Sequence, residues 1–404
     1  MQRRQACGPN ARRKKPKASE LKRFLSVKCR DIRPSLMMKM AAMAEGIEGC
    51  IDLTLGEPDI STPETICLAL YDAAKRGETH YVPGMGIPGL RIAISGYWKR
   101  RYGMDYSPEE ILVTTGGSQA SHLAMQACLD PGDEVIILEP FFTFYEQQVL
   151  QAGGVPVYCM SGVENAFLPD PEKIEAGISK KTKAIIINSP CNPTGAVFPV
   201  ELLDDIAGIA SRHDLLVISD ELYEAFVYGV PHVPFASLPR MKERTITIGG
   251  MSKSYAMTGW RIGYAMGSPA ILKAMQVTGV PQTISVNTMV QKASEFALNN
   301  CDDAVGEITS LFKKRVKFAY EKFKDLPGIK TAEPKGSFYL FLDVSGAGMD
   351  GEEFADRALR EAKVVTIPGA SFGPGCGNYV RIACTVSEEM LEEASQRILK
   401  ILLK

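Results

Sequence analysis

Residues 249–264 read GGMSKSYAMTGWRIGY and place one lysine, Lys253, eight positions ahead of an arginine, Arg261. The stretch continues from the run TITIG at 245–249, whose β-branched residues are typical of a strand. A lysine on a helix surface usually has other charged residues beside it, whereas Lys253 lies among glycine, serine and threonine. Such residues allow a backbone to approach a ligand closely. We therefore expect a strand that ends in a ligand-binding loop carrying Lys253.

The same arrangement, a short apolar run followed by a turn and a helical pattern, repeats from about residue 105 to residue 265. The runs are ILVTT at 111–115, EVIIL at 134–138, VPVYCM at 155–160, AIIIN at 184–188, LLVIS at 215–219 and TITIG at 245–249. Continuous apolar strands that alternate with helices indicate a parallel sheet covered on both faces. The sequence therefore predicts an α/β fold with a mostly parallel central sheet.

The pattern changes after two long helical stretches, at about 286–299 and 303–325. Beyond them come the apolar runs SFYLFLDV, VVTIP and YVRIAC, with helical patterns near 351–362 and 387–403. This mixture predicts a smaller α+β domain, and 404 residues exceed what a single core usually supports. The predicted organisation is a disordered basic tail over 1–28, an N-terminal segment over 29–60 that joins the small domain, a large domain over 61–300 and a small domain over 301–404.

Charge argues against two classes of function. The chain has a net charge of −1, although residues 1–23 hold nine basic side chains and one acidic one. This polar, proline-containing head is typical of a disordered tail, and the remainder of the chain is net acidic. No apolar stretch reaches the roughly 18 residues of a membrane span. We expect no nucleic-acid partner and no membrane association.

Cysteine and histidine spacing also limits the possibilities. The ten cysteines form no CxxC or paired pattern, which in a chain of this size predicts reduced thiols and a cytoplasmic location. The four histidines have no metal-binding spacing, so we expect no metal. Residues 84–89, GMGIPG, match the GxGxxG pattern, but no apolar strand precedes them. We therefore do not expect a nicotinamide or flavin cofactor.

Residues with reactive or polar side chains follow the ends of several predicted strands. In open α/β sheets, ligands bind outside the carboxyl ends of the strands. The candidates are Gly117 and Ser118 at a helix start, Phe142, Asn192, Asp220, Tyr223, Lys253 and Arg261, with Arg381 in the later run YVRIAC. Each alone could be a helix cap, a core residue, a turn residue or a surface charge. Together they predict one ligand site.

This combination is what pyridoxal 5′-phosphate requires. A lysine amine forms a Schiff base with the cofactor aldehyde, so Lys253 is the catalytic candidate. A carboxylate, here Asp220, keeps the ring nitrogen protonated. Asn192 and Tyr223 would donate hydrogen bonds near the phenolic oxygen. The phosphate needs a helix N-terminus and a guanidinium, here Arg261.

Five motifs resemble those of the class I, fold-type I aminotransferases, in particular the branch with prokaryotic aspartate, aromatic and acetyl-diaminopimelate aminotransferases. They are LTLGEPD at 53–59, YVPG at 81–84 ahead of GLR at 89–91, NSPCNPTG at 188–195, SDELY at 219–223 and SKSYAMTGWRIG at 252–263. The resemblance runs from about residue 29 to the end of the chain. It implies the transfer of an amino group from an L-amino acid to a 2-oxo acid by a ping-pong mechanism.

The resemblance also implies roles that spacing alone does not. Arg381, helped by Asn192, would bind the substrate α-carboxylate, and the backbone of Gly56 would close over the substrate. Phe142 would stack on the cofactor ring. Tyr81 would reach the phosphate of the neighbouring subunit, which implies a homodimer with shared active sites. The helix start at 117–118 would hold the phosphate of its own subunit.

Three positions depart from the family's usual pattern. Phe142 stands where many relatives have Trp or Tyr, and Gly250 stands where others have a serine that faces the phosphate. Ser118 stands where aspartate-specific relatives of this branch carry a lysine for the distal carboxylate. Because no second cation is visible, we expect neutral, apolar or aromatic substrates to be favoured over aspartate.

Two alternatives remain open at this point. A β-eliminating C–S lyase of the same fold shares the Schiff-base machinery, although lyase relatives often have histidine where Cys191 stands. A DNA-binding regulator of this fold would carry a folded winged-helix domain in front, and residues 1–28 are too short for one. An aminotransferase is therefore the preferred interpretation.

Overall fold

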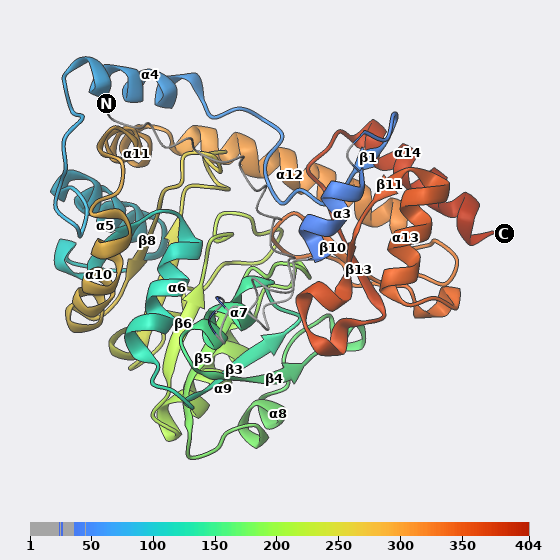
Figure 1. Ribbon diagram of the computed structural model, residues 1–404, viewed down its shortest axis with the longest axis horizontal. Helices are drawn as coiled ribbons and strands as arrows, with labels where there is room; N and C mark the ends of the chain where they lie inside the picture. The colour runs from blue at the N-terminus through green and yellow to red at the C-terminus, as the bar shows by residue number, and fades with distance from the viewer. Residues whose placement is uncertain (1–23, 25, 27–35, 45, 404) are drawn as a thin grey trace, which may run out of the picture. The chain divides into compact units, whose positions relative to one another are not determined.

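A seven-stranded sheet with the order β2-β8-β7-β6-β5-β3-β4 forms the centre of the fold (Figure 1). It is seen in a computed structural model that describes residues 24, 26, 36–44 and 46–403. The strands are β2 (Ile111–Thr114), β3 (Glu134–Glu139), β4 (Val155–Met160), β5 (Thr182–Asn188), β6 (Leu216–Asp220), β7 (Thr245–Gly250) and β8 (Gly263–Met266). β8 runs antiparallel to both its neighbours, and every other neighbouring pair is parallel. The predicted α/β fold with a mostly parallel central sheet is confirmed.

The two faces of this sheet pack against different helices. Alternate residues of a strand point to opposite faces, so Ile185 and its neighbour Ile186 of β5 belong to separate cores. Ile185 packs with residues of α9 (Val200–Arg212). Ile186 packs with residues of α6 (Gly117–Cys128) and α10 (Pro269–Thr283). The strands are buried on both faces, which explains their continuous apolar runs.

Further helices surround the large sheet and lead out of it. They are α4 (Glu64–Lys75), α5 (Pro88–Tyr102), α7 (Phe144–Gln151), α8 (Pro171–Ala176), α11 (Thr288–Asn300) and α12 (Asp302–Phe323). Short 3₁₀ helices lie at η2 (Pro108–Glu110), η3 (Val163–Asn165), η4 (Phe235–Ser237), η5 (Lys242–Arg244) and η6 (Ser345–Ala347). The two long helical stretches predicted near 286–299 and 303–325 correspond to α11 and α12.

Sequence reading did not predict β8 or α10. β8 has only four residues and lies at the end of the lysine loop, where no turn signal separates it from the loop. α10 contains Gly279 and Pro281, which disfavour a helix interior. Its packing explains the exception, because a Cβ at Gly279 would lie 2.9 Å from Leu123 of α6. Gly279 therefore permits the close contact between α10 and α6.

A second, four-stranded sheet has the order β12-β13-β10-β9, and all its paired strands are antiparallel. Its strands are β9 (Lys330–Thr331), β10 (Tyr339–Asp343), β12 (Ile367–Pro368) and β13 (Tyr379–Ala383). The helices α13 (Gly351–Ala362) and α14 (Glu388–Leu402) accompany this sheet, and η7 (Gly369–Phe372) and η8 (Pro374–Cys376) connect β12 to β13. The predicted helices near 351–362 and 387–403 are present.

Two elements before residue 60, α3 (Leu36–Ala44) and β1 (Ile51–Asp52), lie against the elements that accompany this second sheet. β1 pairs in parallel with β11 (Val364–Val365). Met40 of α3 packs in a small cluster with Leu359 of α13. We propose the division at 61–300 and 301–404, with the segment up to residue 60 joining the small domain, because the two sheets fall on either side of residue 300. Apart from Phe24 and Ser26, the predicted tail over 1–28 lies outside the described residues, as do residues 29–35.

Within the described part of the chain, no helix combines the length and apolar character needed to cross a bilayer.

Truncation at the centre of the sheet should destabilise the fold. Ile186 is 2% exposed between helices and strands, so Ile186→Ala should lower the free energy of unfolding by about 2–5 kcal/mol, from lost burial and the cavity left behind. Val155, 45% exposed on the edge strand β4, provides the control, and Val155→Ala should change stability by less than about 0.5 kcal/mol. Chemical denaturation would measure the free energy of unfolding of both variants. An equal decrease in Ile186→Ala and Val155→Ala would contradict the packing described for β5.

Candidate active site

The carboxyl ends of β5, β6 and β7 lie side by side at one edge of the central sheet. Asn188 of β5 pairs in register with Asp220 of β6, and Asp220 pairs with Ile248 of β7. The loops that follow β5 and β7 carry Asn192 and Lys253. Parallel pairing therefore brings together side chains that are more than sixty positions apart in the chain.

These loops surround a cavity of about 200 Å³. Ten of the eleven residues predicted for the site line it, namely Gly56, Gly117, Ser118, Phe142, Asn192, Asp220, Tyr223, Lys253, Arg261 and Arg381. The exception is Tyr81, which is 77% exposed and does not line this cavity. Its expected contact is with a second subunit, so it stays a prediction.

Other residues line the cavity that sequence reading did not single out. They are Ser121, Tyr145, Asn188, Leu222, Ser252, Thr258 and Tyr339. Within the described residues, no group of three His, Cys, Asp or Glu side chains is placed to hold a metal ion.

Lys253 presents an amine of lowered basicity. Its Nζ donates a hydrogen bond to the carbonyl oxygen of Gly56 at 2.5 Å. Burial lowers the pKa of Lys253 to about 8, and the charges of Arg381 and Arg261 lower it further, while Glu57 acts in the opposite direction. A neutral amine is a nucleophile and a base, whereas an ammonium ion is neither. The lowered pKa therefore increases the fraction of Lys253 that is a neutral amine near neutral pH.

Asp220 is a buried carboxylate at the end of β6. Burial raises its pKa to about 6, and hydrogen bonds from the Tyr145 hydroxyl and the Leu222 N–H oppose that rise. The Tyr145 hydroxyl donates to Asp220 Oδ2 at 2.5 Å, and the Leu222 N–H donates to Oδ1 at 3.2 Å. No described Lys, Arg or His forms an ion pair with Asp220. The carboxylate is thus held by neutral donors and lacks a cation.

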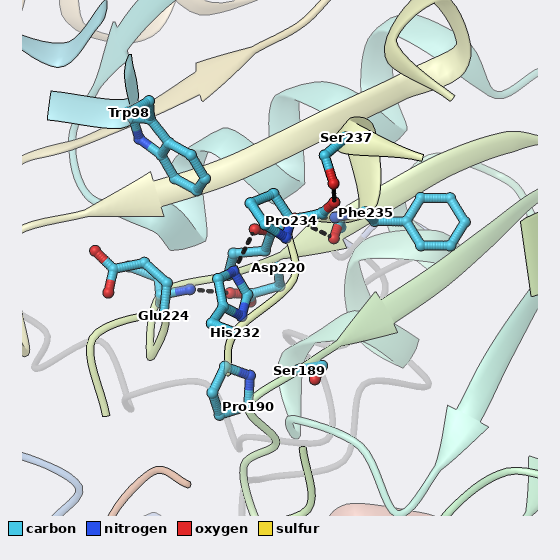
Figure 2. Close-up of polar contacts among 12 residues, drawn as sticks. Trp98, Ser189, Pro190, Asp220, Glu224, His232, Pro234, Phe235 and Ser237 are labelled. Atoms are coloured by element: carbon cyan, nitrogen blue, oxygen red, sulfur yellow. Dashed lines mark hydrogen bonds and ion pairs between the residues drawn. The ribbon is translucent and has the colours of Figure 1, made fainter. Parts of the chain in front are cut away.

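The loop that follows Asp220 is held by a buried polar cluster. His232 Nε2 and Glu221 Oε2 lie 2.8 Å apart, and Glu221 Oε1 also accepts from the Ser219 hydroxyl and the Phe235 N–H. Figure 2 shows His232 between Glu224 and the Pro234–Phe235 segment. Because these groups are buried, their hydrogen bonds fix the loop's backbone.

Another part of the cavity wall, at the start of α6, has the chemistry of an anion site. The first N–H groups of α6, from Gly117 and Ser118, have no partner within the helix because no turn precedes them. Arg261 lies against Gly116, where a Cβ would come 2.6 Å from Arg261 Nη2. Arg261 has no carboxylate partner among the described residues, and its Nη1 donates to the Thr258 carbonyl at 2.7 Å. Arg261 has φ +56°, a strained conformation of the kind found at functional sites.

Arg381 is a second unpaired cation, and it is 2% exposed. Its Nη1 donates to Asn192 Oδ1 at 3.0 Å and its Nη2 donates to the Thr54 carbonyl at 2.6 Å. Its guanidinium lies 4.5 Å from the Tyr339 ring centroid and 5.0 Å from that of Phe372. Burial lowers the pKa of Arg381. A buried cation without a counter-charge is costly, so this arrangement favours an anionic ligand.

The segment 53–59 covers the cavity. Gly56 lines it, and a Cβ at Gly56 would collide with the Tyr339 hydroxyl. The Tyr339 hydroxyl in turn shares a hydrogen bond of 2.7 Å with the Tyr223 hydroxyl. Thr385 Oγ1 donates to the Leu55 carbonyl at 2.8 Å on the other side of the segment. Backbone carbonyls of one short segment therefore accept hydrogen bonds from Lys253, Arg381 and Thr385.

The aminotransferase class I and II family model matches residues 48–398 of the chain. The chain belongs to this family. It is an aminotransferase, with the fold-type I architecture that the sequence predicted. Aminotransferases of this family use pyridoxal phosphate.

Individual relatives support the same assignment. The chain is 40% identical to an aspartate aminotransferase of Bacillus sp. (strain YM-2) over 94% of its length and 99% of the relative. It is 38% identical to the aromatic-amino-acid aminotransferase 2 of Thermococcus litoralis, over 94% of this chain and 98% of that one. The structure of Thermus thermophilus aspartate aminotransferase with maleate has a TM-score of 0.88 at 38% identity, covering 93% of this aminotransferase and 99% of that chain.

Removing the Tyr145 hydroxyl should make the stability of this aminotransferase more dependent on pH. The folded-state pKa of Asp220 is raised to about 6, so ionisation of Asp220 costs stability as pH rises through that value. Tyr145→Phe removes a donor to the ionised form, and a hydrogen bond to a charged group contributes about 1.5–3 kcal/mol. The extra destabilisation should therefore be present at pH 8 and largely absent at pH 5, as measured by chemical denaturation of the cofactor-free protein.

The double variant Tyr145→Phe/Asp220→Asn separates this effect from packing. Without a titrating carboxyl, the stability difference due to Tyr145→Phe should no longer vary between pH 5 and pH 8. A pH-dependent difference that persists in the Asp220→Asn background would show that the Tyr145 hydroxyl acts on another group.

Proposed function

We propose that this aminotransferase holds pyridoxal 5′-phosphate in the cavity and transfers the amino group of a neutral, apolar or aromatic L-amino acid to a 2-oxo acid. The observation that carries this proposal is the placement of Lys253, Asp220 and Arg381 around one cavity without an ion-pair partner among the described residues. Asp220 and Arg381 need partners of opposite charge, and the Lys253 amine needs a carbonyl group to react with; the cofactor with an amino acid would provide all three.

The residues around the cavity fit both the ring nitrogen and the phosphate of the cofactor. Asp220 is a buried anion that would face a protonated ring nitrogen, and the unpartnered N–H groups at the start of α6 with Arg261 would hold a phosphate. Asn192 and Tyr223 would donate to the phenolic oxygen, and Phe142 would lie against the ring. Bound pyridoxal phosphate would supply an aldehyde that reacts with amines and a ring that accepts electrons.

The chain's own groups would then perform the remaining work. Arg381 would bind the substrate α-carboxylate through a charge-assisted contact, with Asn192 fixing the orientation of the guanidinium. Lys253 Nζ would take the proton from the substrate Cα as a general base. It would then donate a proton as a general acid. Because Arg381 and Lys253 would serve both substrates, the first product must leave before the second substrate enters, which predicts ping-pong kinetics.

The substrate preference follows from the charges that line the cavity. Its cations are Lys253, Arg261 and Arg381, and each already has an assigned partner in this proposal. Ser118 offers only a hydroxyl. Glu57 of the covering segment accepts a hydrogen bond at 2.8 Å from the hydroxyl of Thr258, a residue that lines the cavity, and so adds negative charge next to it. A distal carboxylate would therefore meet no free cation among the described residues, which favours neutral side chains over aspartate.

We also propose a homodimer in which Tyr81 contacts the phosphate of the partner subunit. Its high exposure and its position outside this chain's cavity support that role. Every cysteine that the structure describes is a free thiol, which supports a reducing, cytoplasmic location.

Lys253→Ala should abolish the visible absorption that the purified holoenzyme owes to cofactor bound through a lysine. The physical reason is that alanine has no amine to react with the aldehyde. Absorption spectra after incubation with pyridoxal phosphate and gel filtration would measure this. Lys273→Ala, at an exposed position of α10, should leave the spectrum unchanged. A spectrum retained in Lys253→Ala would assign the linkage to another residue.

A half-reaction screen should identify the donor class. The pyridoxal form is mixed with each amino acid, and loss of its absorption band should require lower concentrations of apolar or aromatic amino acids than of aspartate. Arg381→Ala should raise the required concentration at least about 30-fold, because truncating a buried charge pair costs 2–5 kcal/mol. Arg244→Ala, at a surface ion pair with Asp214, is the control. Preference for aspartate would refute the specificity, and pyruvate release from cystathionine without an acceptor would indicate a lyase.

A further inference from the structure

Glu139, the last residue of β3, carries a buried carboxylate that the proposed chemistry does not use. It is 3% exposed, and no described basic side chain forms an ion pair with it. Its Oε1 accepts a hydrogen bond from the Gly375 N–H at 2.5 Å and lies 3.6 Å from the Cys376 thiol. Burial raises the pKa of Glu139, and these two donors oppose the rise. The carboxylate thus joins the central sheet to the loop between β12 and β13.

A second hydrogen bond joins the same two segments. The Phe141 N–H donates to the Phe372 carbonyl at 2.9 Å. We call this bond and the Glu139–Gly375 bond together the 139–375 bridge. The bridge lies between the strand end that leads to Phe142, which lines the cavity, and the loop that leads into the strand of Arg381.

The loop side of the bridge contacts the carboxylate-binding arginine. Phe372 carries the carbonyl of one bridge bond, and its ring centroid lies 5.0 Å from the Arg381 guanidinium. Arg381 Nε is buried without a hydrogen-bond partner, so on that side the guanidinium is oriented by packing. The position of Phe372 therefore influences the direction in which Arg381 presents its nitrogen atoms.

The loop can approach Glu139 only because it contains glycine. Gly373 has φ +137°, and a Cβ there would collide with the Glu139 carboxylate. A Cβ at Gly375 would lie 3.3 Å from both carboxylate oxygens. The close contact between the loop and the Glu139 carboxylate therefore depends on glycine at positions 373 and 375.

We propose that Glu139 is a positioning residue that holds the loop at 372–376 so that Phe372 keeps Arg381 aligned for a substrate carboxylate. This inference rests on the proposed role of Arg381. It predicts that loss of the Glu139 carboxylate weakens carboxylate binding while the cofactor remains bound. A purely structural role for Glu139 would instead lower stability without a selective effect on carboxylate affinity.

The test uses the holoenzyme and 3-phenylpropionate, a carboxylic acid that has no amino group and cannot react. Glu139→Ala should weaken its binding about tenfold, because small displacements of a positioning group cost this much or more. Glu139→Gln keeps an acceptor for the Gly375 N–H and should restore most of the affinity. In the amino-acid half-reaction, the apparent dissociation constant of the amino acid should rise more than the limiting rate falls in Glu139→Ala, with cofactor content unchanged.

Glu146→Ala is the matched control. Glu146 lies in α7 and accepts from the Tyr158 hydroxyl at 2.6 Å, and it forms no hydrogen bond or ion pair with the described residues of the loop at 372–376. The Glu146→Ala variant should be less stable than the unaltered protein but should keep its affinity for 3-phenylpropionate. Should Glu139→Ala fail to fold, Gly373→Ala should reproduce the weaker binding, because its methyl group displaces the loop from the carboxylate.

The outcomes separate this inference from the proposed function. Two results would overturn the positioning role of Glu139. One is unchanged 3-phenylpropionate affinity in a folded Glu139→Ala variant, and the other is an equal loss of that affinity in Glu139→Ala and Glu146→Ala. Unchanged binding in Arg381→Ala would instead overturn the proposed role of Arg381. Weaker 3-phenylpropionate binding in both Arg381→Ala and Glu139→Ala, with most of the affinity retained in Glu139→Gln, would support the inference.

Discussion

The site of this aminotransferase depends on one electrostatic constraint, which is that charged groups are buried around a cavity without ion-pair partners. Arg381 is almost fully buried and bonds only to neutral oxygen atoms. Asp220 is buried and receives hydrogen bonds only from neutral donors. Such groups lose their hydration and gain no compensating charge in the protein. Burying such groups lowers the stability of the free protein, and a ligand with opposite charges would offset that loss when it binds.

The backbone makes that arrangement possible. Parallel strands end at the same edge of a sheet, so the register Asn188–Asp220–Ile248 gathers three loops at one place. Close approaches between segments occur at glycine. Gly56 passes over the Tyr339 hydroxyl, and Gly373 passes over the Glu139 carboxylate. The covering segment and the loop before β13 can therefore contact the cavity residues without displacing them.

The hydrogen bonds around the cavity link its two sides. The covering segment bonds to Lys253 of the large sheet's loop and to Arg381 of the small sheet. The 139–375 bridge crosses between the same two sheets at a different point. Movement of one sheet relative to the other would change both sets of bonds. The orientation of Arg381 is thus coupled to the packing between the sheets as well as to its own strand.

Periodicity and motif order in the sequence were sufficient to predict the parallel sheet, the two long helices and ten residues that line the cavity. Continuous β-branched runs can be buried only in a sheet covered on both faces, and lysine in a small-residue loop is unusual enough to be informative. The strand β8 and the helix α10 were missed, because four residues give no periodic signal and because Gly279 and Pro281 disfavour the helix that packing against Leu123 stabilises.

Sequence by itself determined the type of fold, the family and the chemical identity of the main groups, because strand and loop patterns are local and reactive residues stand out by type. Only the tertiary structure decided which aromatic and acidic residues support those groups. Tyr145 and Glu139 look like ordinary residues of an apolar stretch, and their partners Asp220 and Gly375 are 75 and 236 positions away. Hydrogen bonds across such distances arise from chain packing, which no local pattern records.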